Sequence, residues 1–362
     1  MSKGIVYKGE GIFSYCGWPT VARLADDTLA VVFSGHRLRH VCTFGETMIC
    51  YSYDEGKSWT APSAVVNTRF DDRDGGIAVK GNQVLVTSFN NNYAFQSAHV
   101  KANEKDENVR AMIESYIQLN QGVANEDDVG SSITVSEDGG NTFSKRYMMP
   151  ITSPHGPKVL KDGRYVYVGR AFSINDVYKT AGRVYRELSE GIYCMFSKDG
   201  YTWTDPVAIP LPNEEDIILN CEPDVIECDD GELLVHIRVQ KRGVSFDDMW
   251  IYQTRSKNGC TEWEIPHDIG VQGAPPHLFR HSSGKLVCVY GRRKTPFAQE
   301  AIVSDDDGKT WSMPRCIDGE AASADLGYPS SVELNDGKIM TVYYQRDDGE
   351  ERPNLKYTVW EL

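Results

Sequence analysis

Short runs of alternating apolar residues recur along the chain, and each run directly follows a polar turn. In the first copy, residues 25–28 form the turn and residues 29–32 form the apolar run. A run of this length after turn residues predicts a buried β-strand. The six copies are residues 25–32, 81–86, 162–168, 230–235, 283–288 and 336–341.

A second motif, Ser-x-Asp-x-Gly-x-x-Trp, lies between these runs. Residues 52–59 and 304–311 are complete copies, residues 136–143 have Phe for Trp, residues 197–203 are one position shorter, and residues 256–263 lack the Asp. The Ser and Asp oxygens accept hydrogen bonds from backbone N–H groups, and Gly adopts the positive φ of a tight turn. The motif therefore predicts a hairpin turn whose aspartates have a structural role.

The two motifs keep the same register over nearly the whole chain, which indicates a repeat architecture. Six similar sheets arranged radially form a β-propeller. We therefore predict an all-β fold, a six-bladed β-propeller formed by one domain of residues 1–362. Residues 4–13 and 355–362 are expected to share one blade and close the ring.

One segment departs from the strand pattern. Between residues 103 and 121, Val109, Met112, Ile113, Tyr116 and Ile117 recur at helical spacing. We predict a helix there, within an insertion covering about residues 95–130. Two interpretations stay open: a surface helix on the propeller rim, or an active-site cover or subunit contact. In the second case a homo-oligomer would form through the insertion.

Composition narrows the classes of partner and compartment. The net charge of −14 argues against nucleic acid or an anionic membrane surface as a partner, although it leaves a small anionic substrate open. The nine cysteines show no Cys-x-x-Cys spacing, which argues against a zinc site and favours reduced thiols. The first residues include no apolar signal run. We expect a cytoplasmic protein without a metal or other cofactor.

Arginine follows five of the six repeated strands, although the chain is acidic overall. We expect the repeated strands to be the innermost strands of the blades, and residues that follow the innermost strands of a propeller converge at one mouth. Guanidinium groups that share a cavity repel one another unless an anion lies between them, so this recurrence predicts an acidic ligand or paired acidic side chains. These arginines are Arg37, Arg170, Arg238, Arg292 with Arg293, and Arg346.

Acidic and phenolic side chains precede the same strands. Glu222 precedes the fourth repeat, Tyr328 the sixth and His155 the third, while residues 71–74 precede the second. A tyrosine beside a glutamate becomes a nucleophile when the carboxylate takes the phenol proton. A neutral phenol also avoids charge repulsion with an anionic substrate.

With these residues, the chain resembles the sialidase (neuraminidase) superfamily, whose members are six-bladed propellers with Asp-box repeats. The resemblance implies that Tyr328 is the nucleophile and Glu222 its partner. It also implies that Arg238, and either Arg292 or Arg293, bind a substrate carboxylate. Arg37 matches an auxiliary substrate arginine of the family.

Two positions depart from the family pattern. Residues 17–19 read Gly-Trp-Pro where the family has Arg-Ile-Pro, so one carboxylate-binding arginine is missing. The loop of residues 38–47 lacks the aspartate that serves the family as general acid and base. His36, His40 and Glu46 are candidate replacements, since histidine titrates in the useful range.

Three functions follow as hypotheses. The first is an exo-acting glycoside hydrolase that releases sialic acid or another acidic sugar, with Tyr328, Glu222, His40 and Glu46 as catalytic candidates. The second is a hydrolase or lyase on a uronic-acid or neutral glycan, using His40 or His155 with the aspartates near residue 72. The third is a non-catalytic propeller that binds a glycan. The candidate substrate-binding residues are His36, Arg37, Asp72, Arg73, Asp74, His155, Arg170, Arg238, Arg292 and Arg293.

Overall fold

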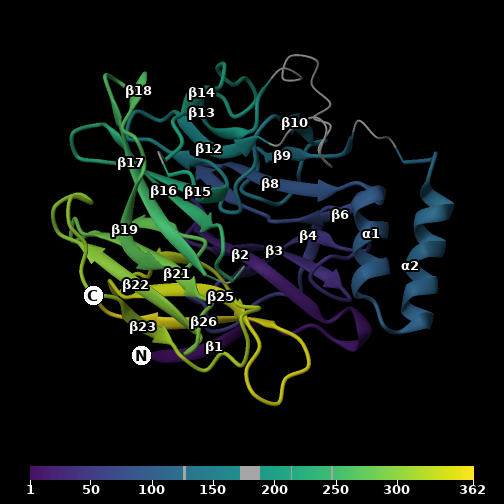
Figure 1. Cartoon of the computed structure of the whole chain (residues 1–362). Coiled ribbons are helices and arrows are strands. Elements are labelled where there is room, and N and C mark those ends of the chain that lie inside the picture. The colour runs from purple at the N-terminus through teal and green to yellow at the C-terminus, as the bar shows by residue number, and fades with distance from the viewer. Residues whose placement is uncertain (125–127, 172–187, 213, 246–247) are drawn as a thin grey trace.

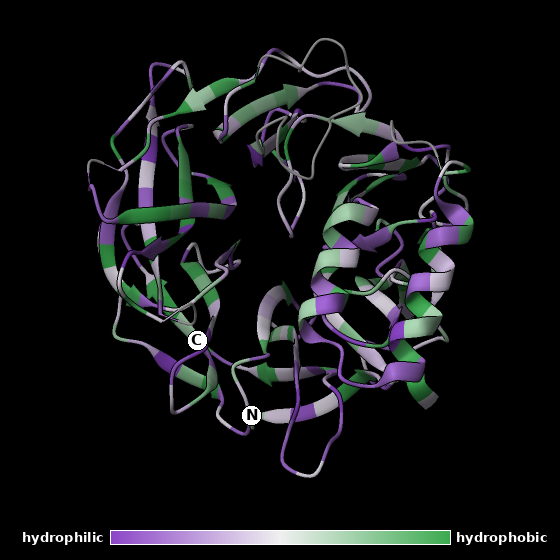
Figure 2. Cartoon of the chain, turned by 45° about the vertical axis from the view of Figure 1, so that its right-hand side comes forward, coloured by the Kyte–Doolittle hydropathy of each residue, from purple (hydrophilic) through white to green (hydrophobic). Residues whose placement is uncertain are grey.

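A computed structural model describes residues 1–124, 128–171, 188–212, 214–245 and 248–362. Within these residues, strands form six antiparallel sheets that follow one another around a ring, as Figure 2 shows. The sheets are consecutive in the chain, and each contacts the next near the centre. The predicted six-bladed β-propeller is therefore confirmed.

Each blade is built from consecutive strands. Blades 1 to 3 comprise β2 (Tyr15–Arg23), β3 (Leu29–Arg37), β4 (Glu46–Ser52) and β5 (Ser63–Val66); β6 (Asp71–Arg73), β7 (Ile77–Lys80), β8 (Gln83–Asn91), β9 (Ser131–Ser136) and β10 (Tyr147–Met149); and β11 (Lys158–Val159), β12 (Tyr165–Ala171), β13 (Gly191–Ser197) and β14 (Val207–Ile209). Blades 4 to 6 comprise β15 (Ile217–Glu227), β16 (Leu233–Lys241), β17 (Met249–Lys257), β18 (Glu262–Trp263) and β19 (His267–Gln272); β20 (His277–Arg280), β21 (Leu286–Arg292), β22 (Ala298–Ser304) and β23 (Arg315–Asp318); and β24 (Gly327–Glu333), β25 (Ile339–Gln345), β26 (Asn354–Trp360) and β1 (Ser2–Tyr7).

The two ends of the chain share the sixth blade. Strand β1 pairs antiparallel with β26, with Ser2 opposite Val359, and both termini lie on the same side of the molecule in Figure 1. This pairing joins the first strand of the sequence to the last sheet, which closes the ring as expected.

The six repeated apolar runs form the second strand of each blade, so the prediction that they are innermost is wrong. The first strands line the centre, because β2 contacts β24 and β7, and β20 contacts β15 and β24. Strands β2, β15 and β24 contain register shifts, so their apolar pattern is broken and less visible in the sequence. The repeated second strands are almost entirely buried, as predicted.

Hydrophobic cores fill the spaces between neighbouring sheets. One cluster joins Trp18 and Val31 of blade 1 to Tyr344 and Leu355 of blade 6, and another joins blades 3 and 4. Each sheet therefore buries both faces against its neighbours. This packing fixes the angles at which the blades deliver their side chains to the central axis.

The Ser-x-Asp turns connect the third and fourth strands of their blades. In the first copy, Ser52 Oγ accepts a hydrogen bond of 2.8 Å from the Gly56 amide, and Asp54 Oδ1 accepts one of 2.9 Å from the Ser58 amide. The hydrogen bonds from Ser58 lower the pKa of Asp54 to about 2. The turns at residues 136–142 and 304–310 repeat these bonds, so the predicted structural role is confirmed.

The insertion between β8 and β9 forms two helices, α1 (Tyr93–Asn103) and α2 (Glu107–Asn120), which pack against the loop after β3 and the segment before β6, at the right of Figure 1. Helix α2 matches the predicted segment, and its Ile113 and Ile117 are buried. Helix α1 was not predicted, because one of its three buried positions is Gln96 and the apolar spacing is incomplete. Neither helix of the described residues has the length and apolar character needed to cross a membrane.

Candidate active site

A cavity of about 280 Å³ gathers side chains from all six blades or their flanking loops. Its apolar wall includes Phe89, Phe95, Pro154 and Leu219. Its polar and ionisable lining residues include His40, Arg73, Asp74, Arg170, Glu222, Arg238, Arg293 and Tyr328. Eight of the predicted site residues therefore meet in one place.

Tyr328 and Glu222 form a direct pair at this cavity. The Tyr328 hydroxyl, from β24 of blade 6, donates a hydrogen bond of 2.6 Å to Glu222 Oε1, from β15 of blade 4. Arg238 of β16 donates to the other carboxylate oxygen at 2.5 Å. The ring thus brings together two residues that stand 106 positions apart in the sequence, as the resemblance implied.

The backbone presents these side chains through a conformation that is rare for residues other than glycine. The φ angles of Trp18, Asp74, Glu222 and Tyr328 are 55°, 54°, 47° and 47°. Such left-handed backbone costs roughly 1–2 kcal/mol per residue. In β2, β15 and β24 it coincides with a register shift, which re-aims the local side chain.

A signal for these positions is present in the sequence. Trp18, Glu222 and Tyr328 are each followed by proline, and each lies on the first strand of its blade. This shared residue-proline pair makes Trp18 structurally equivalent to the two predicted catalytic residues, Glu222 and Tyr328. The arginine missing from the family pattern belongs at the preceding position, Gly17.

The environment gives the two paired groups different protonation states. Burial and the adjacent Glu222 carboxylate raise the pKa of Tyr328 well above its usual value. Burial alone would also raise the pKa of Glu222, but the Arg238 guanidinium and the Tyr328 hydrogen bond hold it below its usual value. At neutral pH a neutral phenol therefore faces an ionised carboxylate, which is the arrangement of a nucleophile with its base.

Arg293 is the arginine after β21 that reaches the cavity. Its guanidinium carbon lies 5.5 Å from the centre of the Tyr328 ring, and its Nε and Nη2 have no hydrogen-bond partner among the described residues. The neighbouring Arg292 does not line the cavity and forms an ion pair of 3.3 Å with Glu300. Arg170 lines the cavity and contacts Glu190 and the Asn220 carbonyl.

Trp18 lies fully buried beneath two arginines. The guanidinium of Arg73 stacks 4.3 Å from its ring centre and that of Arg37 lies at 4.9 Å. Arg73 lines the cavity. Arg37 does not, because its fully buried guanidinium donates to Asp71 Oδ1 at 2.5 Å and to the Asp72 carbonyl. In this structure Arg37 therefore braces blades 1 and 2 from behind the cavity.

Of the three candidates His36, His40 and Glu46, only His40 lines the cavity. Its Nδ1 lies 3.0 Å from the Tyr15 hydroxyl and 3.4 Å from Asp325 Oδ1. Enclosure of the ring, with a smaller effect of Arg73, lowers the pKa of His40 to about 4 although Asp325 opposes the change. His36 and Glu46 bond to each other at 3.0 Å outside the cavity lining.

Asp72 and His155 also lie away from the cavity lining. Asp72 is fully buried and accepts hydrogen bonds from Thr68 and Asn90, and its burial raises its pKa to about 6. The buried His155 lies 3.2 Å from Thr20 Oγ1 and contacts the His277 ring edge-on. Both residues belong to the interior between blades in this structure.

The apolar wall was missed by the sequence analysis. Phe89 lies near the end of strand β8, and Phe95 lies in the first turn of α1, so the helical insertion contributes directly to the cavity. The side of the cavity nearest blade 2 is therefore aromatic. Only the fold reveals this, because Phe95 precedes the segment with clear helical spacing.

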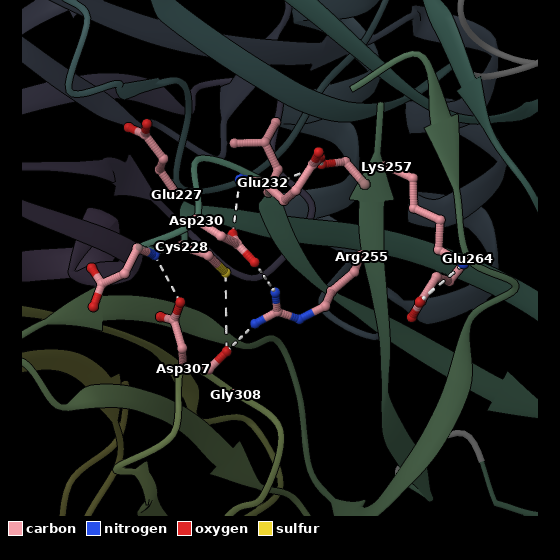
Figure 3. Close-up of polar contacts among 12 residues, drawn as sticks. Glu227, Cys228, Asp230, Glu232, Arg255, Lys257, Glu264, Asp307 and Gly308 are labelled. Carbon is pink, nitrogen blue, oxygen red and sulfur yellow. Dashed lines mark hydrogen bonds and ion pairs between the residues drawn. The ribbon is translucent and has the colours of Figure 1, made fainter. Parts of the chain in front are cut away.

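A separate acidic cluster lies between blades 4 and 5 (Figure 3). Cys228, Asp230 and Asp307 offer ligand atoms within 4.8 Å of one another. Arg255 pairs with Asp230 at 3.5 Å, and Arg280 pairs with Asp307 at 2.5 Å. Burial raises the pKa of the Cys228 thiol to about 12. The two guanidinium groups already supply the positive charge here, so the cluster acts as an ion-paired brace between the blades.

The model of the BNR repeat-like domain family matches residues 113–342, which is more than half of the chain. The protein belongs to this family. No curated protein sequence matches the chain significantly.

Solved structures share the whole architecture. A protein of unknown function from Dyadobacter fermentans is 18% identical, with a TM-score of 0.75 over 100% of this chain and 98% of that one. The NanB sialidase of Streptococcus pneumoniae is 14% identical, with a TM-score of 0.63 over 99% and 70%. The Trypanosoma rangeli sialidase in complex with the inhibitor DANA is 15% identical, with a TM-score of 0.61 over 96% and 55%. The chain thus has the propeller fold of sialidases and spans 70% and 55% of the lengths of these two sialidases.

Proposed function

We propose that the protein is an exo-acting glycoside hydrolase that releases a terminal acidic sugar, sialic acid or a similar one, with Tyr328 as nucleophile. The observation that carries this proposal is the 2.6 Å hydrogen bond from the Tyr328 hydroxyl to Glu222 within the cavity. A binding scaffold has no need of a phenol paired with an ionised carboxylate at its ligand site. Tyrosine is the nucleophile that sialidases use in place of a carboxylate.

In the proposed first step, Glu222 takes the phenol proton while the Tyr328 oxygen bonds to the anomeric carbon. The glycosidic bond breaks with its electron pair on the leaving oxygen, which takes a proton from an acid in the cavity, and a covalent tyrosyl glycoside remains. The base form of that acid then takes a proton from water, the water oxygen bonds to the anomeric carbon, and the departing Tyr328 oxygen regains its proton from Glu222. Arg238 supports this cycle because it keeps Glu222 ionised between turnovers.

The charge of the cavity supports an acidic sugar. Glu222 already neutralises part of the charge of Arg238, and Asp74 lies 3.5 Å from Arg73. Arg293 has two nitrogens without hydrogen bonds and no ion pair to a carboxylate of the described residues. A substrate carboxylate beside Arg293 would form charge-assisted hydrogen bonds with this guanidinium.

The size of the cavity supports exo action. Its volume of about 280 Å³ is near the lower end of small-molecule pockets, which span roughly 300–1,000 Å³. A space of this size suits one sugar ring at a chain end better than an internal segment of a glycan. The apolar wall around Phe95 then lies beside the ring or its leaving group.

A second candidate, a uronic-acid glycoside, is favoured by one observation. Gly17 stands where the sialidase pattern has a carboxylate-binding arginine, and the next residue, Trp18, is a fully buried indole that carries no charge. Arg293 then offers its unpaired nitrogens to a single carboxylate, which a uronic acid also carries. The nucleophile pair is the same for both sugars, so the two candidates differ only in the ring that the cavity accepts.

The test is the variant Tyr328→Phe on a panel of 4-methylumbelliferyl glycosides of sialic acid, glucuronic acid and neutral sugars. The wild type is expected to hydrolyse an acidic member of the panel, which also identifies the sugar. In the variant we expect kcat to fall by at least about 10³-fold, while the free sugar still binds in calorimetry. Turnover equal to that of the wild type would contradict the proposal.

A further inference from the structure

Three functional groups enter the cavity from alternate blades of the ring. Asp74, Glu222 and Tyr328 belong to blades 2, 4 and 6, and their φ angles of 54°, 47° and 47° are nearly the same. Alternate blades of a six-membered ring are evenly spaced around its axis. Tyr328 and Glu222 bond to each other, so Asp74 faces this pair from the remaining side.

The surroundings hold Asp74 in place without satisfying its carboxyl group. Its amide donates to Ser34 Oγ at 3.1 Å, and Arg73 Nε lies 3.5 Å from its Oδ1. Oδ1 is enclosed, yet no hydrogen bond reaches it from the described residues, and 17% of the side chain is exposed in the cavity. An enclosed carboxyl oxygen without a hydrogen bond and a left-handed backbone both lower the stability of the fold locally. Such features are typical of functional sites.

Burial favours the protonated form of Asp74. Burial raises its pKa, and the carboxylates of Glu222 and Asp71 act in the same direction, while Arg73 and Arg37 oppose the rise. The pKa of Glu222 is shifted in the opposite direction, below its usual value. Two carboxyl groups of one cavity whose pKa values are pushed apart mark an acid and a base.

The other cavity residue considered for proton donation is less suited to it. His40 holds its Nδ1 beside Tyr15 and Asp325, and desolvation lowers the pKa of its imidazole, which disfavours the protonated, proton-donating form. His36 and Glu46 bond to each other outside the lining. Among the described lining residues this leaves Asp74 as the carboxyl group that faces the nucleophile and is not itself the base.

We infer that Asp74 is the general acid and base of the hydrolysis, a role that rests on the proposed function. As the Tyr328 oxygen bonds to the anomeric carbon, the glycosidic bond gives its electron pair to the leaving oxygen, which takes the Asp74 proton. In the second step the Asp74 carboxylate removes a proton from water. That water oxygen bonds to the anomeric carbon, and the Tyr328 oxygen leaves with its electron pair and regains its proton from Glu222.

The experiment compares Asp74→Asn with the wild type on two glycosides of the same acidic sugar. The 4-nitrophenyl glycoside has a leaving group that departs without protonation, whereas a lactose-linked sugar needs an acid. We expect kcat/KM for the lactose-linked substrate to fall by about 10²–10⁴-fold, with a loss below about tenfold in the first, bond-breaking step on the 4-nitrophenyl substrate. Single-turnover release of nitrophenol isolates that step.

The controls separate this inference from the function beneath it. Tyr328→Phe is expected to lose activity on both substrates equally. Asp305→Asn, which removes an exposed carboxylate of a distant turn, is expected to keep its activity on both. An equal loss of both substrates in Asp74→Asn would overturn the acid role while leaving the function intact, because a residue that only binds or positions the sugar affects both alike. Wild-type protein that cleaves neither substrate would overturn the function itself.

Discussion

Replacement of Arg293 by methionine tests whether an uncommitted guanidinium serves the substrate. In the free protein this side chain is mostly buried, and its Nε and Nη2 lack hydrogen-bond partners among the described residues. Truncating one member of a buried charged pair costs about 2–5 kcal/mol of binding. At about 1.4 kcal/mol per decade, kcat/KM for the acidic substrate should fall between about 30-fold and several thousand-fold.

Stability should change in the opposite direction. Methionine has a similar length and leaves no charge to desolvate, so Arg293→Met should be as stable as the wild type or more stable by about 1 kcal/mol. Losing activity while keeping or gaining stability is the signature of a residue held for function. Thermal unfolding beside kinetics on the same preparations measures both.

The assay compares each protein on a substrate and on the methyl ester of that substrate, which lacks the negative charge. If Arg293 binds the carboxylate, the wild type loses activity on the ester, and Arg293→Met treats acid and ester alike. The coupling between the two changes should be about 2 kcal/mol or more. Equal losses on acid and ester, or a variant destabilised by more than about 2 kcal/mol, would refute the assignment.

Three further outcomes follow from the site. In the wild type, kcat/KM should stay constant as the pH falls to 4.5, because the lowered pKa of Glu222 keeps its carboxylate ionised down to that pH. A decrease in kcat/KM that begins above pH 4.5 would contradict the pairing of Tyr328 with an ionised Glu222. Arg238→Met should move the decrease to higher pH and lower the free energy of unfolding by about 3 kcal/mol in urea titration, since Glu222 loses its counter-charge. Phe95→Ala should raise KM for aryl glycosides several-fold without lowering the melting temperature, because 36% of this side chain is exposed. An unchanged KM would show that α1 does not contribute to substrate binding.

The blade count was predictable because its signals are local. Each turn closes within a few residues, as Ser52 and Asp54 do with Gly56 and Ser58, and each apolar run is buried by its own neighbours. Tyr328 and Glu222 could be named because they stand in segments that resemble a known family. Their contact depends on the closed ring, which the sequence indicates only through the repeat number.

The remaining site residues depend on partners that the sequence does not specify. Arg37 looks like a substrate arginine until the fold places Asp71, 34 residues later, against its guanidinium. Asp72 and Asp74 would share one face of a regular strand, but the left-handed backbone at Asp74 breaks the alternation. Asp74 therefore lines the cavity while Asp72 is buried behind it. Such bends are set by packing at the axis.

The central claim is that Tyr328 becomes covalently attached to the sugar. The direct measurement is mass spectrometry after incubation with a fluorinated analogue of the preferred acidic sugar that carries a fluoride leaving group and slows release of the intermediate. Peptide mapping should place the added sugar mass on the segment containing Tyr328, and Tyr328→Phe should show no such mass. Turnover of the substrate without any adduct on Tyr328, or an adduct on another residue, would contradict the account.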